Sequence, residues 1–374
     1  MYGRKILFKL SDKEILFLVS LFLITFSKGI GLDSSSGLYL SVTISSFILI
    51  LLKVTLEKWK IKDIYLIFLI VIIFGVSFII NHEEALLFTS ILAIGSKGIS
   101  LKKIFSVMII SRVLGFIYNF FGTMLGFVEN RSILFYRDGQ IIVRNDFGFG
   151  HPNLLHSSIL IIVLLYFFLR YYKISIMDYC VILSINYFFF QFSASRTGYY
   201  SVIIAVLIHI ISRSDLYSNI LRKIVPYVQF TLSFITLLLS YLYNNTLIQR
   251  LDILLTGRIY YSHEQLKYPL TLFGRDYSQT KIIFDNSYSM LFSEYGLIIS
   301  GIFLISYFYV SKKVIHLKDF RYTYILLILS IVLFTESYYT NILYNISLFI
   351  VVKIYFNDIE EATDVVNNNC NPYL

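Results

Sequence analysis

The stretch IYLIFLIVIIFGVSFII at residues 64–80 contains no charged side chain and is followed by the polar residues Asn81 and His82. A helix of about 20 such residues crosses the roughly 30 Å hydrocarbon core of a lipid bilayer. Comparable stretches recur along nearly the whole chain, which is 57% hydrophobic and 15% charged. Because a soluble protein carries roughly 25% charged residues, this composition excludes a water-soluble globular domain and predicts a membrane protein.

The predicted fold class is an all-α polytopic membrane protein with about twelve transmembrane helices, which form a single integral membrane domain over residues 1–374. The chain shows no internal repeat at a fixed period. The spans are predicted near 15–32, 37–55, 64–80, 85–101, 104–126, 153–172, 179–195, 198–212, 225–243, 288–310, 322–339 and 341–356.

The distribution of basic residues predicts the orientation, because cytoplasmic loops of membrane proteins are enriched in Lys and Arg. The short loops 33–36, 81–84 and 340–341 contain neither residue and are predicted to lie outside. Both termini are then cytoplasmic, with a C-terminal tail at about 357–374. The net charge of +9 follows this topology, so nucleic acid is not an expected partner.

Two predicted external loops are long, at about 127–152 and 244–287. Loops of this length in a compact chain are usually functional or disordered. These loops contain Tyr, Phe, Ile and Gly, so we expect them to be ordered. The active region is therefore predicted on the extracytoplasmic face.

The type of basic residue changes across the predicted membrane. The cytoplasmic segments contain sixteen Lys and five Arg, whereas arginine dominates outside, at Arg131, Arg137, Arg144, Arg196, Arg250, Arg258 and Arg275. A planar guanidinium binds phosphate or carboxylate through two parallel hydrogen bonds, which an ammonium cannot do. The pattern favours an anionic substrate group at the outer surface, although pairing with nearby carboxylates or lipid headgroups is the alternative.

Four short segments lie on or beside these loops: FGFGHPN at 147–153, SASRTGYY at 193–200, LLTGR at 254–258 and DNSYSMLFSEYGL at 285–297. Three of them also have an ordinary structural interpretation. The first is also a loop-to-helix junction, the second a hairpin tip with an anchoring Arg196, and the fourth a helix N-cap.

Taken together and in this order, the four segments resemble the Wzy-type repeat-unit polymerases of O-antigen and capsular polysaccharide synthesis, and the related O-antigen ligases. The resemblance implies a GT-C-like fold and a metal-independent glycosyltransferase that needs no cofactor. Its substrates, as donor and acceptor, would be oligosaccharides linked to undecaprenyl diphosphate. It also implies the bacterial cytoplasmic membrane as location, with a chain-length regulator and a flippase as candidate partners.

Residue by residue, Arg196 matches the Ser-Arg-Thr/Ser-Gly arginine of that family, and Arg258 matches its Gly-Arg arginine. Asp285 stands where ligases of this kind often carry a histidine ahead of Asn-x-Tyr-Leu, which disfavours the ligase. Arg137 followed by Gly148 fits an Arg-x10-Gly pattern of some polymerases.

The expected chemistry needs positive charge on the diphosphate and a base for the acceptor hydroxyl. We assign the diphosphate to Arg196, Arg258 and Arg275, with Arg137 or Arg144 contributing from the other loop. The predicted base is Asp285 or His151, and His263 and Glu294 are further candidates. Arg112, inside a predicted span, either lines a groove for the lipid diphosphate or pairs with a polar group such as Glu336.

Two alternatives remain at this point. A ligase would share the fold but transfer the finished glycan to another acceptor. A flippase would move the lipid-linked oligosaccharide across the membrane, although transporters usually show paired repeats, which this chain lacks. The sugars, the linkage and the choice between capsule and O-antigen are not encoded in recognisable residues.

Overall fold

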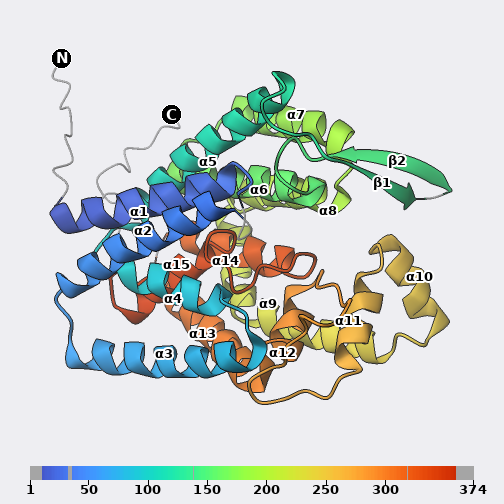
Figure 1. The fold of residues 1–374 in the computed structure, drawn as a ribbon. Helices are drawn as coiled ribbons and strands as arrows, with labels where there is room; N and C mark the ends of the chain where they lie inside the picture. Colours follow the sequence, from blue (N-terminus) through green and yellow to red (C-terminus); the bar gives the residue numbers. More distant parts are fainter. Residues whose placement is uncertain (1–10, 33–35, 138, 318, 359–374) are drawn as a thin grey trace.

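The computed structural model describes residues 11–32, 36–137, 139–317 and 319–358. These residues form helices and one β-hairpin (Figure 1). The elements are α1 (Asp12–Gly29), α2 (Gly37–Thr55), α3 (Ile61–Asn81), α4 (Ala85–Gly95), α5 (Leu101–Met124), β1 (Ser132–Arg137), β2 (Gln140–Asn145), α6 (Pro152–Arg170), η1 (Tyr171–Lys173), α7 (Ile176–Ser193), α8 (Arg196–Ile211), α9 (Asp215–Tyr241), α10 (Thr246–Leu254), α11 (Arg258–Leu266), α12 (Ser287–Ser293), α13 (Gly296–His316), α14 (Phe320–Val332) and α15 (Ser347–Tyr355).

Among the described residues, seven helical stretches are long and apolar enough to cross a membrane, namely α2, α3, α5, α6 continued by η1, α7, α9 and α13. Three shorter apolar helices, α4, α8 and α14, lie beside them. The structure therefore confirms a largely helical fold with several candidate membrane spans. The total of about twelve spans stays a prediction.

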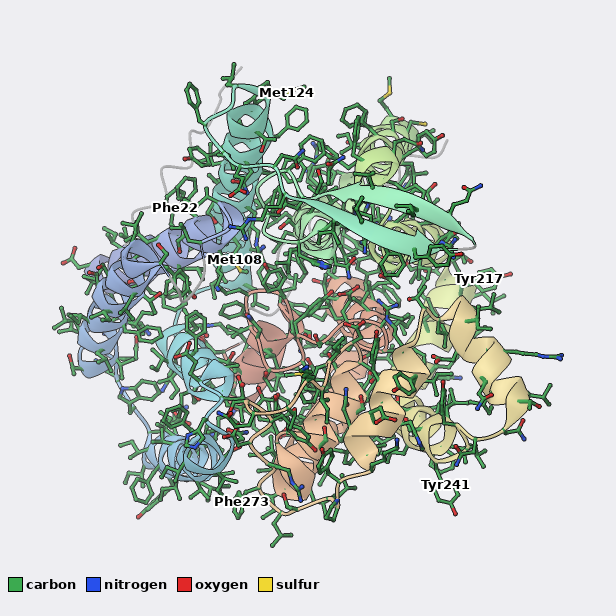
Figure 2. The ribbon with its side chains drawn as sticks, turned by 45° about the vertical axis from the view of Figure 1, so that its right-hand side comes forward. Phe22, Met108, Met124, Tyr217, Tyr241 and Phe273 are labelled. Carbon is green, nitrogen blue, oxygen red and sulfur yellow. The ribbon has the colours of Figure 1, made fainter. Side chains whose placement is uncertain are left out.

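The candidate spans differ in how much of their surface is buried, and α6 is the most buried of them. In α6, 72% of the apolar length is buried, compared with 17% in α3 and in α7. On α3, Ile64 and Phe68 expose 52% and 64% of their surface, and Tyr241 at the end of α9 is 83% exposed (Figure 2). Apolar helix faces of this extent match a bilayer better than water, so we expect α3 and α7 to face lipid.

The predicted span 288–310 is wrong as one helix, because it is divided into α12 and α13. Gly296 has φ +82° at the break, and the segment before α12 packs against it: a Cβ on Gly274 would lie 1.8 Å from the Glu294 carbonyl oxygen. The amide of Leu297 then donates to Thr271 O at 2.9 Å. The extended segment 271–275 thus takes the place of the missing helical turn.

Three other predicted spans, at 85–101, 322–339 and 341–356, are shorter than expected. The helix predicted at 85–101 ends at Gly95, and a turn with Gly98 at φ +77° leads into α5. The helix predicted at 322–339 ends at Val332, and residues 333–346 are largely irregular before the nine-residue α15. We refer to residues 333–346 as the connecting segment.

One side chain of the connecting segment and one from α4 hold this segment in place. The Asn345 side chain donates to Tyr339 O at 2.7 Å, and the Thr89 hydroxyl of α4 accepts from the Ile342 amide at 3.1 Å. Buried backbone groups outside a helix must find such partners. These bonds replace the helical ladder that the predicted span would have supplied.

Both predicted external loops contain regular structure and lie at the same end of the molecule (Figure 1). The loop 127–152 contains the antiparallel hairpin, in which Ile133 pairs with Arg144 and Arg137 pairs with Gln140. The loop 244–287 contains α10 and α11. We call this end, with the N-termini of α6 and α8, the loop face. The tail predicted at 357–374 lies outside the described residues after Asp358.

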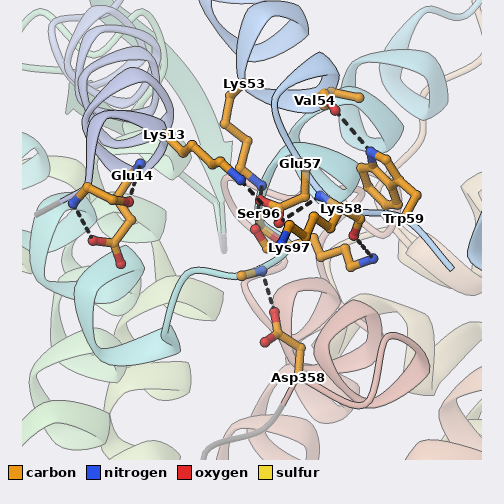
Figure 3. A network of polar contacts seen from close by, with 12 residues as sticks. Lys13, Glu14, Lys53, Val54, Glu57, Lys58, Trp59, Ser96, Lys97 and Asp358 are labelled. Carbon is orange, nitrogen blue, oxygen red and sulfur yellow. Dashed lines mark hydrogen bonds and ion pairs between the residues drawn. The ribbon is translucent and has the colours of Figure 1, made fainter.

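A lysine-rich polar network occupies a site away from the loop face (Figure 3). The buried ammonium of Lys53 lies 2.9 Å from Glu57, and that of Lys97 lies 2.8 Å from Asp63. The amide of Gly98 donates to the Asp358 carboxylate at 2.6 Å. The network therefore ties α2 and α3 to the turn before α5 and to the end of α15.

Candidate functional site

The FGFGHPN segment forms a tight loop that positions the N-terminus of α6. Phe147, Gly148 and Gly150 all have positive φ, between 49° and 79°, which glycine adopts at low cost. His151 caps α6: its Nδ1 accepts from the Asn153 amide at 3.1 Å. Pro152 follows as the first helical residue, the position where its missing N–H costs nothing.

Arg144 joins this loop to the SASRTGYY segment. Its Nε donates to Ser193 O at 2.8 Å, and its Nη2 donates to the side-chain oxygen of Asn153 at 2.6 Å. The same Asn153 oxygen accepts from the Ser195 hydroxyl at 3.1 Å. Arg144 is 6% exposed, so it is a fixed part of the junction between β2, α6 and the α7–α8 turn.

The α7–α8 turn places Arg196 and Thr197 at the start of α8. Ala194 ends α7 with φ 45°, and Ser195 precedes α8. Gly198 allows α8 to approach α6, because a Cβ there would lie 2.3 Å from the His156 Cβ. Arg196 is partly buried at this turn.

The LLTGR segment orients Arg258, the first residue of α11. Thr256 and Gly257 have φ 58° and 86°, and the Asp252 carboxylate accepts from the amides of Ile259 and Tyr260 at 2.7 and 3.3 Å. Asp252 therefore caps α11 from the end of α10. The sequence did not predict this role.

The guanidinium of Arg258 makes four hydrogen bonds. Nε donates to Thr335 O at 3.0 Å and Nη2 to the Thr197 hydroxyl at 3.3 Å. Nη1 donates to Leu255 O at 3.2 Å and to the Thr256 hydroxyl at 2.6 Å. One side chain thus connects α8, α10, α11 and the connecting segment.

In the DNSYSM segment the capping residue is Asn286 and not Asp285. The Asn286 side-chain oxygen accepts from the amides of Tyr288 and Ser289 at 2.8 and 3.1 Å. Its amide nitrogen donates to Phe334 O at 2.8 Å. The Asp285 carboxylate interacts electrostatically with His151 and with Glu336.

Glu336 joins the same group from the connecting segment. Its carboxyl lies near Thr197 and in the fields of Arg258, Asp285 and Arg144. Burial raises the pKa of this carboxyl to about 7, and Asp285 raises it further while Arg258 opposes the shift. Glu336 was not among the predicted site residues, because it lay within the predicted span 322–339.

We call Arg144, His151, Arg258, Asp285 and Glu336 the arginine–carboxylate cluster. Burial lowers the pKa of His151 and the positive charge of Arg144 lowers it further, while Asp285 and Asp146 oppose the shift. The four motif segments and the connecting segment therefore meet at the loop face, which is predicted to be extracytoplasmic.

Three other predicted site residues lie elsewhere. The Arg275 amide donates to Glu294 O at 3.2 Å, and its guanidinium lies 5.1 Å from the ring centroid of Tyr268. Burial, with the nearby Glu83, raises the pKa of the Glu294 carboxyl to about 8. Arg137 ends β1 four residues from the partner of Arg144, about 13 Å along the strand, and its side chain lies outside the described part.

Arg112 occupies the middle of α5 and is 1% exposed. Its Nη2 donates to Leu343 O at 2.7 Å, and its guanidinium lies 4.5 Å from the ring centroid of Tyr344. Within the described residues, its Nε and Nη1 have no hydrogen-bond partner. Arg112 therefore holds the connecting segment through its backbone, and not through the carboxylate of Glu336.

A cavity of about 540 Å³ lies between α3, α4, α13 and α15. Its lining is largely aliphatic and aromatic, and it shares no residue with the arginine–carboxylate cluster. The cluster, with its charged and titratable groups, is therefore the stronger candidate for chemistry.

No family model, curated protein or solved structure matches this chain.

Proposed function

We propose that this protein is a polysaccharide polymerase that joins oligosaccharide repeat units linked to undecaprenyl diphosphate on the outer face of a bacterial cytoplasmic membrane. The observation that supports the proposal is the convergence of the four motif segments on one arginine–carboxylate cluster. Residues 144–153, 195–197, 255–258 and 285–287 are separate in sequence but share hydrogen bonds or electrostatic contacts there.

The positive charges at the loop face suit a diphosphate leaving group. Arg196 and Arg258 are the first residues of α8 and α11, where the helix dipole makes a cation unfavourable and an anion favourable. A diphosphate beside both helix N-termini would offset this repulsion and have its developing charge stabilised. Arg144 adds a third positive charge to the group. Leaving-group stabilisation is thus the first expected role of the cluster.

The acceptor sugar needs a group that removes its hydroxyl proton as the new glycosidic bond forms. The cluster contains three candidates, His151, Asp285 and Glu336. The proposed reaction therefore needs no residue from outside the loop face for either of its two catalytic tasks.

The first test is to delete the gene, then size the remaining lipid-linked glycans and assign each to a membrane face. Single repeat units on the outer face, without a ladder of longer chains, would support polymerisation. Long chains still attached to lipid would identify a ligase. Single units retained on the inner face would identify a flippase and refute the proposed chemistry.

A further inference from the structure

The cavity between α3, α4, α13 and α15, which we call the α3 cavity, lies apart from the arginine–carboxylate cluster. Its volume of about 540 Å³ falls within the range of ligand pockets, which measure roughly 300–1,000 Å³. On α3 the lining runs from Leu66 to Phe74, about 12 Å along the helix axis. The cavity therefore extends along much of the predicted span 64–80.

Polar contacts hold α3 at both of its ends. Near its start, the Lys97 ammonium lies 2.8 Å from the Asp63 carboxylate. At its end, the side-chain amide of Asn81 donates to Glu294 O at 3.1 Å. Because both ends are fixed to the rest of the protein, the space between α3 and α13 is part of the fold.

The lining of the α3 cavity suits a hydrocarbon chain. Its polar side chains are hydrogen-bonded within the protein: Thr89 to Thr340 O, Ser90 to Leu86 O, Tyr307 to Ser347, and Tyr355 to Ser306. Water occupies a cavity where it finds about two to four polar partners. An acyl chain needs none, so it matches this lining better than water does.

Aromatic side chains lie at the end of the cavity near the start of α3, which is predicted to be cytoplasmic. Phe356 lines the cavity, and its ring centroid lies 5.8 Å from that of Trp59. The Lys97 ammonium lies 4.1 Å from the Trp59 ring centroid (Figure 3). Tryptophan is enriched at membrane–water interfaces, so Trp59 indicates where the headgroup of a lipid in this cavity would lie.

This end of the cavity carries an excess of positive charge. Three carboxylates near it are each paired with a lysine: Glu57 with Lys53, Asp63 with Lys97, and Asp358 with Lys353. Lys58, Lys60 and Lys62 are additional and exposed. Basic clusters between membrane helices on the cytoplasmic side bind anionic lipid headgroups. The charge at this end therefore favours an anionic lipid.

The opposite end of the cavity is acidic. Leu297 lines it there, and the Glu83 amide donates to the side-chain oxygen of Asn81, which is bonded to Glu294 O. The carboxylates around this end are Glu83, Glu84 and, 4.0 Å from His82, Asp276, against one arginine, Arg275. A diphosphate at this end would be repelled by these carboxylates. The lipid-linked substrate is thus not the expected occupant.

We propose that the α3 cavity binds an acyl chain of an anionic phospholipid from the predicted cytoplasmic leaflet, with the headgroup phosphate at Lys58, Lys60 and Lys62. The chain then lies between α3 and α13, and the headgroup lies beside Trp59. The inference does not depend on the polymerase proposal, because the site shares no residue with the arginine–carboxylate cluster.

The experiment uses Trp59 as the probe, because it is the single tryptophan of the chain. The full chain is reconstituted in phosphatidylcholine vesicles that contain increasing fractions of phosphatidylglycerol with brominated acyl chains, and the quenching of tryptophan fluorescence is measured. Each lysine near a membrane surface favours anionic lipid about fivefold. Brominated phosphatidylglycerol should therefore reach half-maximal quenching at a mole fraction at least ~10-fold lower than brominated phosphatidylcholine does.

Charge variants test the headgroup site. Changing Lys58, Lys60 and Lys62 together to Gln should bring the two lipids to within about threefold of each other. The matched control changes Lys102, Lys173 and Lys223 to Gln, which removes the same charge from exposed positions on the same predicted face, and should keep the preference. The inference is overturned if the control loses the preference while the Lys58, Lys60 and Lys62 variant keeps it.

A cavity-filling variant tests the chain site. Gly301 lines the cavity, and a Cβ there would meet nothing within 4 Å, so Gly301→Leu should place its side chain in the cavity and weaken quenching by brominated phosphatidylglycerol. Gly75→Leu is the control, because Gly75 is also open on α3 but is not part of the lining. Unchanged quenching of the Gly301→Leu protein would mean that the acyl chain lies elsewhere, and would overturn the inference.

Two results on the wild-type protein also decide the matter, whatever the folding of the variants. Equal quenching by the two brominated lipids would refute an anionic lipid site. Displacement of brominated phosphatidylglycerol by undecaprenyl diphosphate would assign the cavity to the prenyl chain of the proposed substrate, and would overturn the inference in favour of that occupant.

Discussion

Replacing Arg258 with lysine should weaken both the fold and the activity at the loop face. The guanidinium makes four hydrogen bonds that connect α8, α10, α11 and the connecting segment. Lysine keeps the positive charge but has no planar fork of donors, so its ammonium can reach about one or two of these acceptors. Two or three acceptors then lose their partner, at about 1 kcal/mol each.

The expected loss of stability is therefore about 2–3 kcal/mol, or roughly 5 °C in the melting midpoint of a chain of this size. Activity should fall further, by about 100-fold, because Arg258 is expected to stabilise the diphosphate and a displacement of about 1 Å at a reacting group can cost that much. Both quantities can be measured on purified protein, by thermal unfolding in detergent and by polymer formation in liposomes.

The matched control is Arg250→Lys, since Arg250 is exposed on α10 and an exposed conservative change is typically worth less than about 0.5 kcal/mol. If Arg258→Lys melts with Arg250→Lys and makes polymer at the wild-type rate, the tethering argument is refuted. Loss of polymer with an unchanged melting midpoint would instead restrict Arg258 to contacts with the substrate.

Three further changes test how the site is built. Gly198→Ala should lower the stability by about 1–3 kcal/mol by overpacking α6 against α8, because its Cβ would lie 2.3 Å from the His156 Cβ. In the control Gly301→Ala on α13, the new Cβ meets nothing within 4 Å, so this variant should melt like wild type. Asp252→Ala should cost about 1–2 kcal/mol by removing the cap of α11 and should lower activity by shifting Arg258; Asp252→Asn, which keeps an acceptor, should lose less in the same assays. Because the pKa of His151 is lowered in the folded state, the folded protein binds this proton less readily than the unfolded chain, whose histidine pKa is about 6.5. Stability should therefore fall as the pH drops below about 6.5. His151→Gln should make the melting midpoint less sensitive to acid, and an unchanged acid dependence would contradict this account.

The sequence predicted those helices that composition alone determines. The span predicted at 37–55 coincides with α2, and 153–172 lies within α6 and η1, because uninterrupted apolar runs with polar ends leave few alternatives. The break after Glu294 could not be predicted in this way. It depends on Gly274 and Gly296 meeting across a long loop, and periodicity within one segment contains no information about that contact.

The candidate site was predictable to the extent that its residues lie in recognisable local motifs. Arg144, His151, Arg258 and Asp285 are on loops that the sequence marked, and the structure brings them together. Glu336 was missed because ESYYTNILYN at 336–345 is apolar and aromatic enough to resemble part of a span. Its irregular backbone is held by Arg112 and Thr89, which lie more than two hundred residues away in sequence.

The excess of arginine at the loop face now has two separable causes. Arg144 and Arg258 donate to Ser193 O and Leu255 O, carbonyls at the ends of α7 and α10 that lack a helical partner. A guanidinium can donate to such a carbonyl and also to a second segment of the chain. This explains the preference for arginine at these positions without any ligand. Arg258 would therefore attract a diphosphate through its positive charge, because its donors are used within the protein. Binding of undecaprenyl diphosphate to the Arg258→Lys protein distinguishes the two causes. If binding is retained while polymerisation is lost, the guanidinium acts through the fold. If binding is lost, its N–H groups donate to the phosphate when the substrate binds.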